Sequence, residues 1–266
     1  MRKVDSNELK QLQLEILDCV ADYCQKNNIV YWLDCGTLLG AIRHNGYIPW
    51  DDDIDLGMLR PDFDRFINGF NGFNARYQVR CIENDPDFYF GFAKVLDTQT
   101  ILYEPDENGQ KYSINIDVVV YDNAPDDSGE LKKAFMRRDF YRTCNILRNY
   151  NNKPSGNVFR QLFVRFLRLA VKIMPKGYYC RKLVENAKQY NGEQTTRVGN
   201  FLGFYNMTCS KKALESFDTH IFEGKNYVIP VGYDEWLRSF YNNYMKLPPE
   251  EQRVSHHKFV AYIKDS

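Results

Sequence analysis

The residues best suited to chemistry lie in a run of carboxylates at 51–55, which reads DDDID. Acidic and apolar residues alternate from Asp53 to Leu56, and in a strand residues two apart share a face. Asp53 and Asp55 should therefore point together, while Asp52, with the opposite parity, should point away. Two carboxylates on one face repel each other unless a cation lies between them. We therefore predict a site for Mg²⁺ or Mn²⁺, which prefer oxygen ligands of this kind.

A calcium-binding EF-hand loop is the main alternative reading of this run. Asp51, Asp53 and Asp55 match its first three ligand positions, but the motif then needs Gly where Leu56 stands and Glu where Asp62 stands. A merely solvated turn fits less well still, because apolar residues alternate with the acids. The mismatches at Leu56 and Asp62, and the alternation of acidic and apolar residues, favour the Mg²⁺ or Mn²⁺ site over the other two readings.

A second group of residues is suited to binding phosphate. Gly36 and Thr37 open a short predicted helix, and the free N–H groups at a helix N-terminus form a natural phosphate site. Arg43 at the end of this helix and Lys94 on a predicted strand are cations that could contact the same phosphate. Each also has a simpler explanation, since Arg43 would suit a surface turn and Lys94 a solvated strand. His256 and His257 could approach the site from the C-terminal tail, although tail histidines are more often uninvolved.

The apolar pattern predicts the elements that must position these residues. Helices are predicted after a cap at Asp5 or Ser6, over 37–44, from Pro61, and over 130–150 and 158–174. Strands are predicted over 29–33, 53–56, 77–82, 90–96, 100–103 and 112–121. Helices and strands mixed in this order indicate an α+β protein built on a mixed sheet.

Asp117 lies on a predicted strand that is otherwise mainly apolar. A carboxylate in such a place is costly unless it is paired or bound to metal, and its own strand offers no partner. The nearest plausible partner is the acidic strand at Asp53 and Asp55. We therefore predict that the two strands are neighbours and that the three carboxylates converge within roughly 4–6 Å, the range over which such charges couple strongly.

The predicted helix over 158–174 carries an apolar stripe with Arg and Lys mainly outside it. A basic amphipathic helix of this kind can lie on an anionic membrane surface. Such stripes more often face a core, so packing against the rest of the protein is the commoner outcome.

Composition narrows the class of protein further. The chain has 266 residues, 44% hydrophobic and 15% aromatic, with 35 basic and 35 acidic residues, so it gives no support for a general nucleic-acid binder. Seven scattered Cys without C-x-x-C spacing indicate reduced thiols in a cytoplasmic protein. We see no signal peptide and no apolar run long enough to span a bilayer. Motifs of P-loop kinases, dinucleotide-binding proteins, HExxH metalloproteases and α/β-hydrolases are absent.

The stretch from Gly36 to Asp55 resembles the signature of the LicD family of phosphocholine transferases, which is related to the fukutin group and belongs to the nucleotidyltransferase superfamily. The matching residues are Gly36-Thr37 and the pair Asp53-Ile54-Asp55, and the family's third acid on a neighbouring strand would be Asp117. The resemblance continues near the C-terminus, at 230–234 and 247–249. It does not extend to the middle of the chain, from about residue 131 to 200.

The resemblance implies a nucleotidyltransferase-like mixed β-sheet core with flanking helices and a helical C-terminal half. Residues 1–126 would form the catalytic core, and 127–266 a mainly helical region that packs on it and completes the active-site cleft. Asp53, Asp55 and Asp117 would hold Mg²⁺ or Mn²⁺, with Asp117 also the candidate general base. Gly36, Thr37, Arg43 and Lys94 would bind the donor.

The implied reaction is transfer of a phospho-alcohol group, such as phosphocholine, from a CDP-linked donor such as CDP-choline to a hydroxyl group. The acceptor would be a cell-surface glycan such as teichoic acid or lipopolysaccharide, or its lipid-linked precursor. The enzyme would work in the cytoplasm, and the 158–174 helix could hold it at the inner face of the membrane. No nucleic-acid partner is expected.

Two alternatives remain open. The chain could be a true nucleotidyltransferase, which would release pyrophosphate where the favoured reaction releases CMP. It could also be an inactive nucleotide- or sugar-binding module, although the intact acids argue against this. One departure from the family pattern concerns 241–243, which read Tyr-Asn-Asn where Tyr-Gly-Asp is expected. This departure bears on acceptor contacts more than on the chemistry.

Overall fold

The structure is a computed structural model, and it describes residues 1–85, 88, 90–103, 111–149, 157–254 and 260–265. The helices are α1 (Ser6–Lys26), α2 (Cys35–His44), α3 (Arg60–Gly69), α4 (Ser128–Asn149), α5 (Val158–Val171), α6 (Tyr178–Lys188) and α7 (Tyr233–Tyr241), with short 3₁₀ turns η1 (Lys211–Leu214) and η2 (Glu250–Gln252). The strands are β1 (Arg2–Val4), β2 (Trp32–Leu33), β3 (Asp55–Leu59), β4 (Tyr77–Arg80), β5 (Ala93–Asp97), β6 (Thr100–Tyr103), β7 (Lys111–Tyr112), β8 (Asn115–Ala124), β9 (Arg197–Asn200), β10 (Met207–Ser210), β11 (Phe217–Phe222), β12 (Lys225–Pro230) and β13 (Val260–Ile263).

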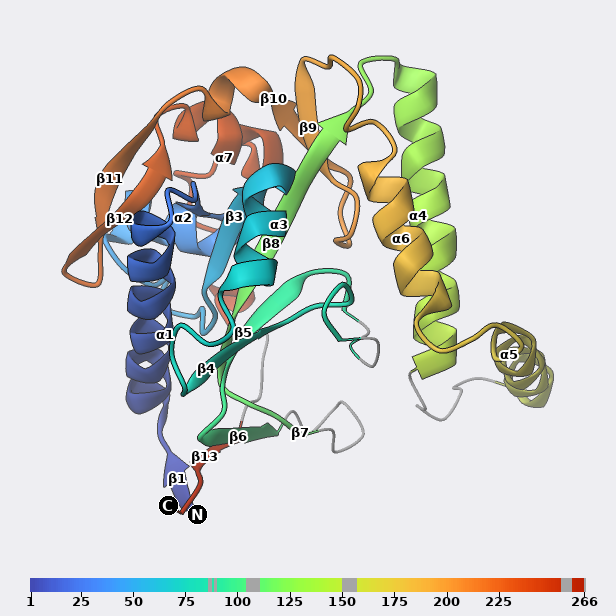
Figure 1. The fold of residues 1–266 in the computed structure, drawn as a ribbon, viewed down its shortest axis with the longest axis horizontal. Helices are drawn as coiled ribbons and strands as arrows, with labels where there is room; N and C mark the ends of the chain where they lie inside the picture. The colour runs from blue at the N-terminus through green and yellow to red at the C-terminus, as the bar shows by residue number, and fades with distance from the viewer. Residues whose placement is uncertain (86–87, 89, 104–110, 150–156, 255–259, 266) are drawn as a thin grey trace.

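Strand β8 is the centre of the main sheet, in which the strand order is β10-β9-β8-β3-β2 (Figure 1). It pairs in parallel with β3 from Asp117 to Tyr121. Its first half also pairs with β5, which continues to β4, and its second half pairs with β9. The prediction that the strand bearing Asp117 lies beside the strand bearing Asp55 is therefore confirmed.

Alternation along β8 explains which helices cover which face. Tyr121 contacts Trp236 of α7, with ring centroids 4.9 Å apart, whereas Asp122 forms an ion pair with Arg60 of α3 at 2.8 Å. Because adjacent side chains of a strand point to opposite faces, α3 and α7 lie on opposite sides of the sheet. Figure 1 shows α3 in front of β3 and β8, with α2 and α7 behind them. The expected α+β architecture with a mixed sheet is therefore confirmed.

Two smaller sheets complete the fold. One joins β1, β13, β6 and β7, which brings the two chain ends side by side, and the other is the β11–β12 hairpin (Figure 1). A single hydrophobic core contains residues from Val4 to Ala261 and so draws on both halves of the chain. The division at residue 126 stays a prediction, although β8 and β9 pair across it.

Several strand limits differ from the predicted ones. The predicted strand over 112–121 is divided, because β7 pairs with β6 in the small sheet while β8 belongs to the main one. Strands β2 and β5 begin later than predicted, at Trp32 and Ala93. The C-terminal half contains the four helices α4 to α7, but also strands β9 to β13, which the pattern did not predict. These strands are four to six residues long and are defined by their pairing partners rather than by local alternation.

The expectation that the apolar stripe of the 158–174 helix packs into the core is wrong. Helix α5 contacts α4 and stands at the edge of the molecule, away from the main sheet (Figure 1). Among its residues only Val171 is buried, in a small separate cluster with Cys144 and Tyr179. Most of the stripe faces outward, because α4 and the start of α6 cover only one narrow side of α5.

Candidate active site

The sheet register places two predicted acids and one predicted cation in a single row. Asp55 on β3 lies opposite Asp117 on β8, and Asp117 lies opposite Lys94 on β5. The Lys94 Nζ atom forms an ion pair with Asp117 Oδ1 at 2.6 Å and donates a hydrogen bond to Asn115 Oδ1 at 3.0 Å. Lys94 is therefore not a solvated strand lysine, and its ammonium group lies next to the third acid.

The aromatic surroundings of Lys94 fix it further. Its ammonium group lies 5.2 Å from the ring centres of both Phe90 and Phe92. Cations over aromatic faces are attracted by the ring quadrupole. The side chain is thus held between two rings and one carboxylate, with only 14% of its surface exposed.

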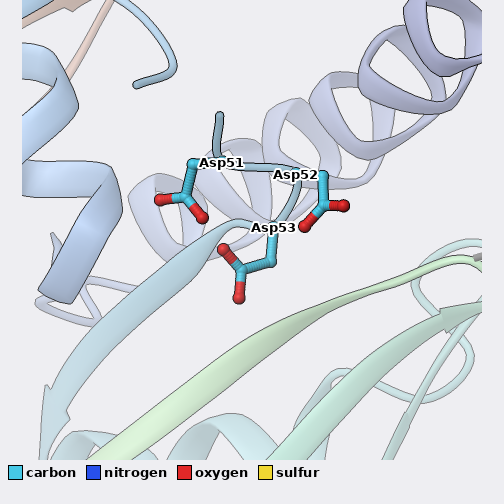
Figure 2. A group of neighbouring side chains, drawn as sticks. All are labelled: Asp51, Asp52 and Asp53. Carbon is cyan, nitrogen blue, oxygen red and sulfur yellow. The ribbon is translucent and has the colours of Figure 1, made fainter. Parts of the chain in front are cut away.

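The loop before β3 brings three more carboxylates together. Asp51, Asp52 and Asp53 each offer an oxygen, and these oxygens lie within 4.8 Å of one another (Figure 2). The prediction that Asp52 points away is therefore wrong. Asp52 does not point away because β3 begins only at Asp55, so the alternation of a strand does not apply to residues 51–53.

The EF-hand alternative is not supported, because the chain continues from Asp55 directly into β3. The parallel pairing with β8 starts at this residue, and the Asp117 N–H donates to the carbonyl of Ile54 at 2.9 Å. An EF-hand loop would continue to position 62, whereas here residues 55–59 form β3 and α3 begins at Arg60.

Asp55 lies at the centre of this negative charge. Burial raises its pKa well above the ordinary range of an aspartate, and Asp53, Asp117, Asp34 and Asp51, in that order, raise it further. Carboxylates from the loop, from β3 and from β8 therefore act on one another electrostatically. The cluster concentrates negative charge that a divalent cation would neutralise.

The start of α2 is joined to β3 by two hydrogen bonds. The Asp55 N–H donates to the Thr37 hydroxyl at 2.9 Å, and the Asp34 N–H donates to the Asp55 carbonyl at 3.0 Å. Thr37 is only 3% exposed, so the structure gives its hydroxyl a positioning role. Whether Gly36 and Thr37 also bind donor phosphate stays a prediction.

Gly36 makes room for a carboxylate that was not among the predicted site residues. A Cβ atom at this position would lie 2.5 Å from Asp51 Oδ2, which is far closer than such atoms approach one another. Any other residue at position 36 would therefore displace Asp51. The adjacency of Asp51 to the predicted acids was the available signal in the sequence.

Asp34 joins the site to the C-terminal helix. Its carboxylate is fully buried and accepts hydrogen bonds from the Tyr121 hydroxyl at 2.6 Å and from Trp236 Nε1 at 2.8 Å. Burial raises its pKa. Asp34 thus connects β8, α7 and the start of α2, a role that sequence patterns did not reveal, because its partners lie 87 and 202 residues away.

Two further side chains adjoin the carboxylates. Burial raises the pKa of the Tyr241 phenol well above its usual value, and Cys35 and Asp55 add to the effect. Burial, followed by Asp34, Asp55 and Asp53, also raises the pKa of the Cys35 thiol. Cys35 therefore stays a protonated thiol and is not suited to be a nucleophile.

The departure at 241–243 has a structural explanation. Asn242 follows α7 with φ 52° and ψ −110°, a conformation that glycine adopts freely. Asn is among the residues that tolerate positive φ best. The chain therefore keeps at Asn242 a backbone turn for which the family pattern has glycine.

Arg43 lies at the end of α2 as predicted, but its contacts are with the protein. Its Nη1 donates to the Tyr244 carbonyl at 2.7 Å, and its Nε donates to His44 Nε2 at 3.0 Å. These contacts join α2 to the segment after α7. A donor contact by Arg43 stays a prediction, and His256 and His257 lie outside the described residues.

The fold and the acidic cluster together define a class of protein. A mixed sheet carries carboxylates on two adjacent parallel strands, with a cation in the same row and a helix N-terminus beside them. Such an arrangement suits the transfer of a phosphoryl-type group, a reaction catalysed mainly by positioning and charge stabilisation.

Comparison with known proteins identifies the family. The sequence model described as "LicD/FKTN/FKRP, nucleotidyltransferase domain" matches residues 28–116. The chain is 30% identical over 271 residues to the lipopolysaccharide cholinephosphotransferase LicD of Haemophilus influenzae, with 99% of this chain and 100% of that protein covered. The chain therefore belongs to the LicD family, and it is a transferase.

Two further relatives match over shorter segments. A 57-residue segment, 21% of this chain and 18% of the relative, is 47% identical to an uncharacterised protein of Rickettsia typhi. A 32-residue segment, 12% of this chain and 6% of the relative, is 59% identical to the ribitol 5-phosphate transferase FKRP of Homo sapiens. These matches agree with the family assignment.

Proposed function

We propose that the protein is a metal-dependent phosphotransferase that moves a phospho-alcohol group, in the first instance phosphocholine, from a CDP-linked donor to a hydroxyl of a glycan. The row formed by Asp55, Asp117 and Lys94 carries this proposal, because it unites two acids and one cation on adjacent strands. The full-length similarity to a lipopolysaccharide cholinephosphotransferase supports phosphocholine and a glycan. The similarity to a ribitol 5-phosphate transferase supports the broader class of phospho-alcohols.

The carboxylates suit Mg²⁺ or Mn²⁺, since all of them offer hard oxygen ligands, Asp51 to Asp53 lie together, and several of them act electrostatically on the half-buried Asp55. Asp53, Asp55 and Asp117 would hold the metal, with Asp51 and Asp52 beside them. A bound divalent cation would neutralise charge on the donor's phosphates and so assist departure of CMP.

Lys94 and Asp117 are proposed to exchange partners during the reaction. In the structure the Lys94 ammonium binds Asp117. A donor phosphate would compete for that ammonium, which leaves the Asp117 carboxylate able to take the proton of the acceptor hydroxyl. The two side chains thus provide one contact for the donor and one base for the acceptor.

The start of α2 is proposed to bind the donor's phosphates. The Asp34 side chain makes no capping hydrogen bond there, and the N-terminal end of a helix favours negative charge. Arg43 would contribute positive charge from the other end of the helix.

We further propose that the enzyme works in the cytoplasm, where CDP-linked donors and a glycan or its lipid-linked precursor would be its partners, and nucleic acid would not. All seven cysteines are free thiols, which supports a reducing compartment.

The test is a donor panel. The protein is incubated with Mg²⁺ and with CDP-choline, CDP-ribitol or CTP, with and without a glycan acceptor, and CMP and pyrophosphate are measured. We expect glycan-dependent release of CMP from CDP-choline and none after chelation of the metal. Pyrophosphate release from CTP would instead indicate a nucleotidyltransferase, and no turnover of any donor would indicate a binding module.

A further inference from the structure

Helix α5 presents an apolar surface that the described part of the protein does not cover. Phe159 and Ile173 are 84% and 81% exposed, and Phe166 and Leu169 are 66% and 68% exposed. All the large apolar residues of this surface are more than half exposed. We call them the α5 face, which includes Ile173 in the turn after the helix: Val158, Phe159, Leu162, Phe163, Phe166, Leu169 and Ile173. Monomeric proteins rarely expose so many adjacent large apolar side chains without a partner.

The charge around the α5 face is of one sign. No acidic residue occurs from 157 to 184, whereas seven basic residues do: Arg160, Arg165, Arg168, Lys172, Lys176, Arg181 and Lys182. The whole chain has equal numbers of acidic and basic residues, so the rest of it carries an excess of seven acidic ones. The cations are therefore concentrated where the apolar side chains are exposed.

The α5 face cannot cross a bilayer. The helix has 14 residues, and among the described residues no helix combines the length and apolarity that a membrane span requires. An amphipathic helix of this kind instead lies in the plane of the interface, with its apolar side among the acyl chains and its basic side chains at the lipid phosphates.

We propose that the α5 face docks the enzyme on the surface of an anionic lipid bilayer. Lipid acyl chains cover the apolar stripe, and lipid phosphates contact the exposed Arg165 and Lys172, which flank it. A second copy of the chain is a poorer occupant, because pairing two α5 faces would bring two sets of cations together with no acidic residue of that segment between them. The proposal goes beyond the transfer reaction and does not rest on the identity of the donor.

Helix α5 is attached to its neighbouring helices by apolar packing and by a hydrogen bond. Val171 is buried with Cys144 and Tyr179, and the Arg148 Nη1 donates to the Val171 carbonyl at 3.2 Å. Docking through α5 would therefore hold the enzyme close to lipid-linked molecules.

Vesicle sedimentation tests the proposal. The full chain is mixed with vesicles of phosphatidylcholine alone or with 30% phosphatidylglycerol, in about 0.1 M salt. We expect at least a tenfold higher bound-to-free ratio on the anionic vesicles, and a loss of that preference in 0.5 M salt. An equally low bound fraction on both kinds of vesicle would overturn the proposal.

Matched variants separate the α5 face from other exposed apolar residues. Phe159→Ser, Phe163→Ser and Phe166→Ser combined should lower vesicle binding at least tenfold, whereas Ile221→Ser with Val231→Ser should leave it unchanged. Ile221 and Val231 are 49% and 54% exposed and belong to the hairpin region across the molecule from α5 (Figure 1). Equal loss in both variants would contradict a specific α5 contact.

A spectroscopic variant reports the contact directly and does not depend on activity. In Phe163→Trp the new indole should shift its emission to shorter wavelength when anionic vesicles are added. The buried Trp32 and Trp236 and the half-buried Trp50, none of which belongs to α5, should give the same background with and without vesicles. Light scattering without lipid measures the oligomeric state. A dimer that the triple serine variant separates, with no emission shift on vesicles, would show that a second copy covers the α5 face.

Discussion

At the scale of single residues, Asp55 should lower the stability of the fold while it serves the proposed reaction. Its side chain is half-buried, and burial together with four neighbouring carboxylates raises its pKa. Such a group destabilises the metal-free fold, and in the proposed function it is kept as a ligand for the metal.

Replacing Asp55 should reveal this opposition. We predict that Asp55→Asn lowers turnover at least 100-fold, because the site loses a metal-binding carboxylate. The same change should stabilise the metal-free protein by roughly 1–2 kcal/mol, because a buried charge among like charges is removed. Turnover and urea denaturation check the two effects. A destabilised variant would contradict the electrostatic account of Asp55.

The stability of the metal-free protein should depend on pH through the same group. Because the folded-state pKa of Asp55 lies above its unfolded value, the folded protein holds this proton to a higher pH. Stability is therefore lost as pH rises between those two pKa values, by at most about 1.4 kcal/mol per pH unit. The advantage of Asp55→Asn over the wild type should accordingly shrink as the pH is lowered from 7 to 5. Comparing the two proteins also cancels the contribution that other groups titrating in this window make to stability. His44 is one such group, and burial lowers its pKa. A constant difference would refute the assignment.

Lys94 should act on the donor rather than on stability alone. We expect Lys94→Met to lower donor affinity or turnover by about 100-fold, since a positive charge facing the phosphates is lost. Lys94→Arg should keep part of the activity. Lys182→Met removes an ion-paired lysine on the surface of α6 and serves as the control. Calorimetric titration with CDP-choline measures the affinity, and equal effects of Lys94→Met and Lys182→Met would exclude a donor contact by Lys94.

At the scale of elements, the acidic strand pair was predictable and the loop before it was not. The cost of leaving Asp117 alone on an apolar strand was enough to place β8 beside β3. The alternation rule then failed at Asp52, because the chain enters β3 only at Asp55. Asp34 was also missed, because its partners Tyr121 and Trp236 are distant in the sequence and such contacts leave no local pattern.

The turn after α7 offers a test at this scale. Asn242 holds φ at 52°, and a non-glycine residue in a sparsely populated conformation costs roughly 1–3 kcal/mol. We predict that Asn242→Gly raises the unfolding free energy by about 1 kcal/mol. Asn243→Gly is the control, because position 243 is not among the described residues with positive φ. Thermal denaturation measures both variants, and an equal loss of stability would show that the backbone at Asn242 is not strained.

At the scale of the whole molecule, the sequence indicated a mixed sheet with helices but not how the second half of the chain completes it. Strands β9 and β10 extend the main sheet, although their sequences RVGN and MTCS carry little strand signal. Helix α5 was recognised from its period, but a period cannot tell whether an apolar stripe faces a core or a membrane. Only the packing of α4 and α6 shows that the described part of the chain leaves most of the stripe uncovered.

The central claim is that the carboxylates of β3, β8 and the loop before β3 form one divalent-cation site. Crystals of the protein grown with Mn²⁺ and CDP-choline would test it by anomalous diffraction at an energy where manganese scatters strongly. We predict an anomalous peak bounded by Asp53, Asp55 and Asp117, which disappears in crystals of Asp55→Asn. No peak at millimolar Mn²⁺, or a peak that none of these aspartates contacts, would contradict the account.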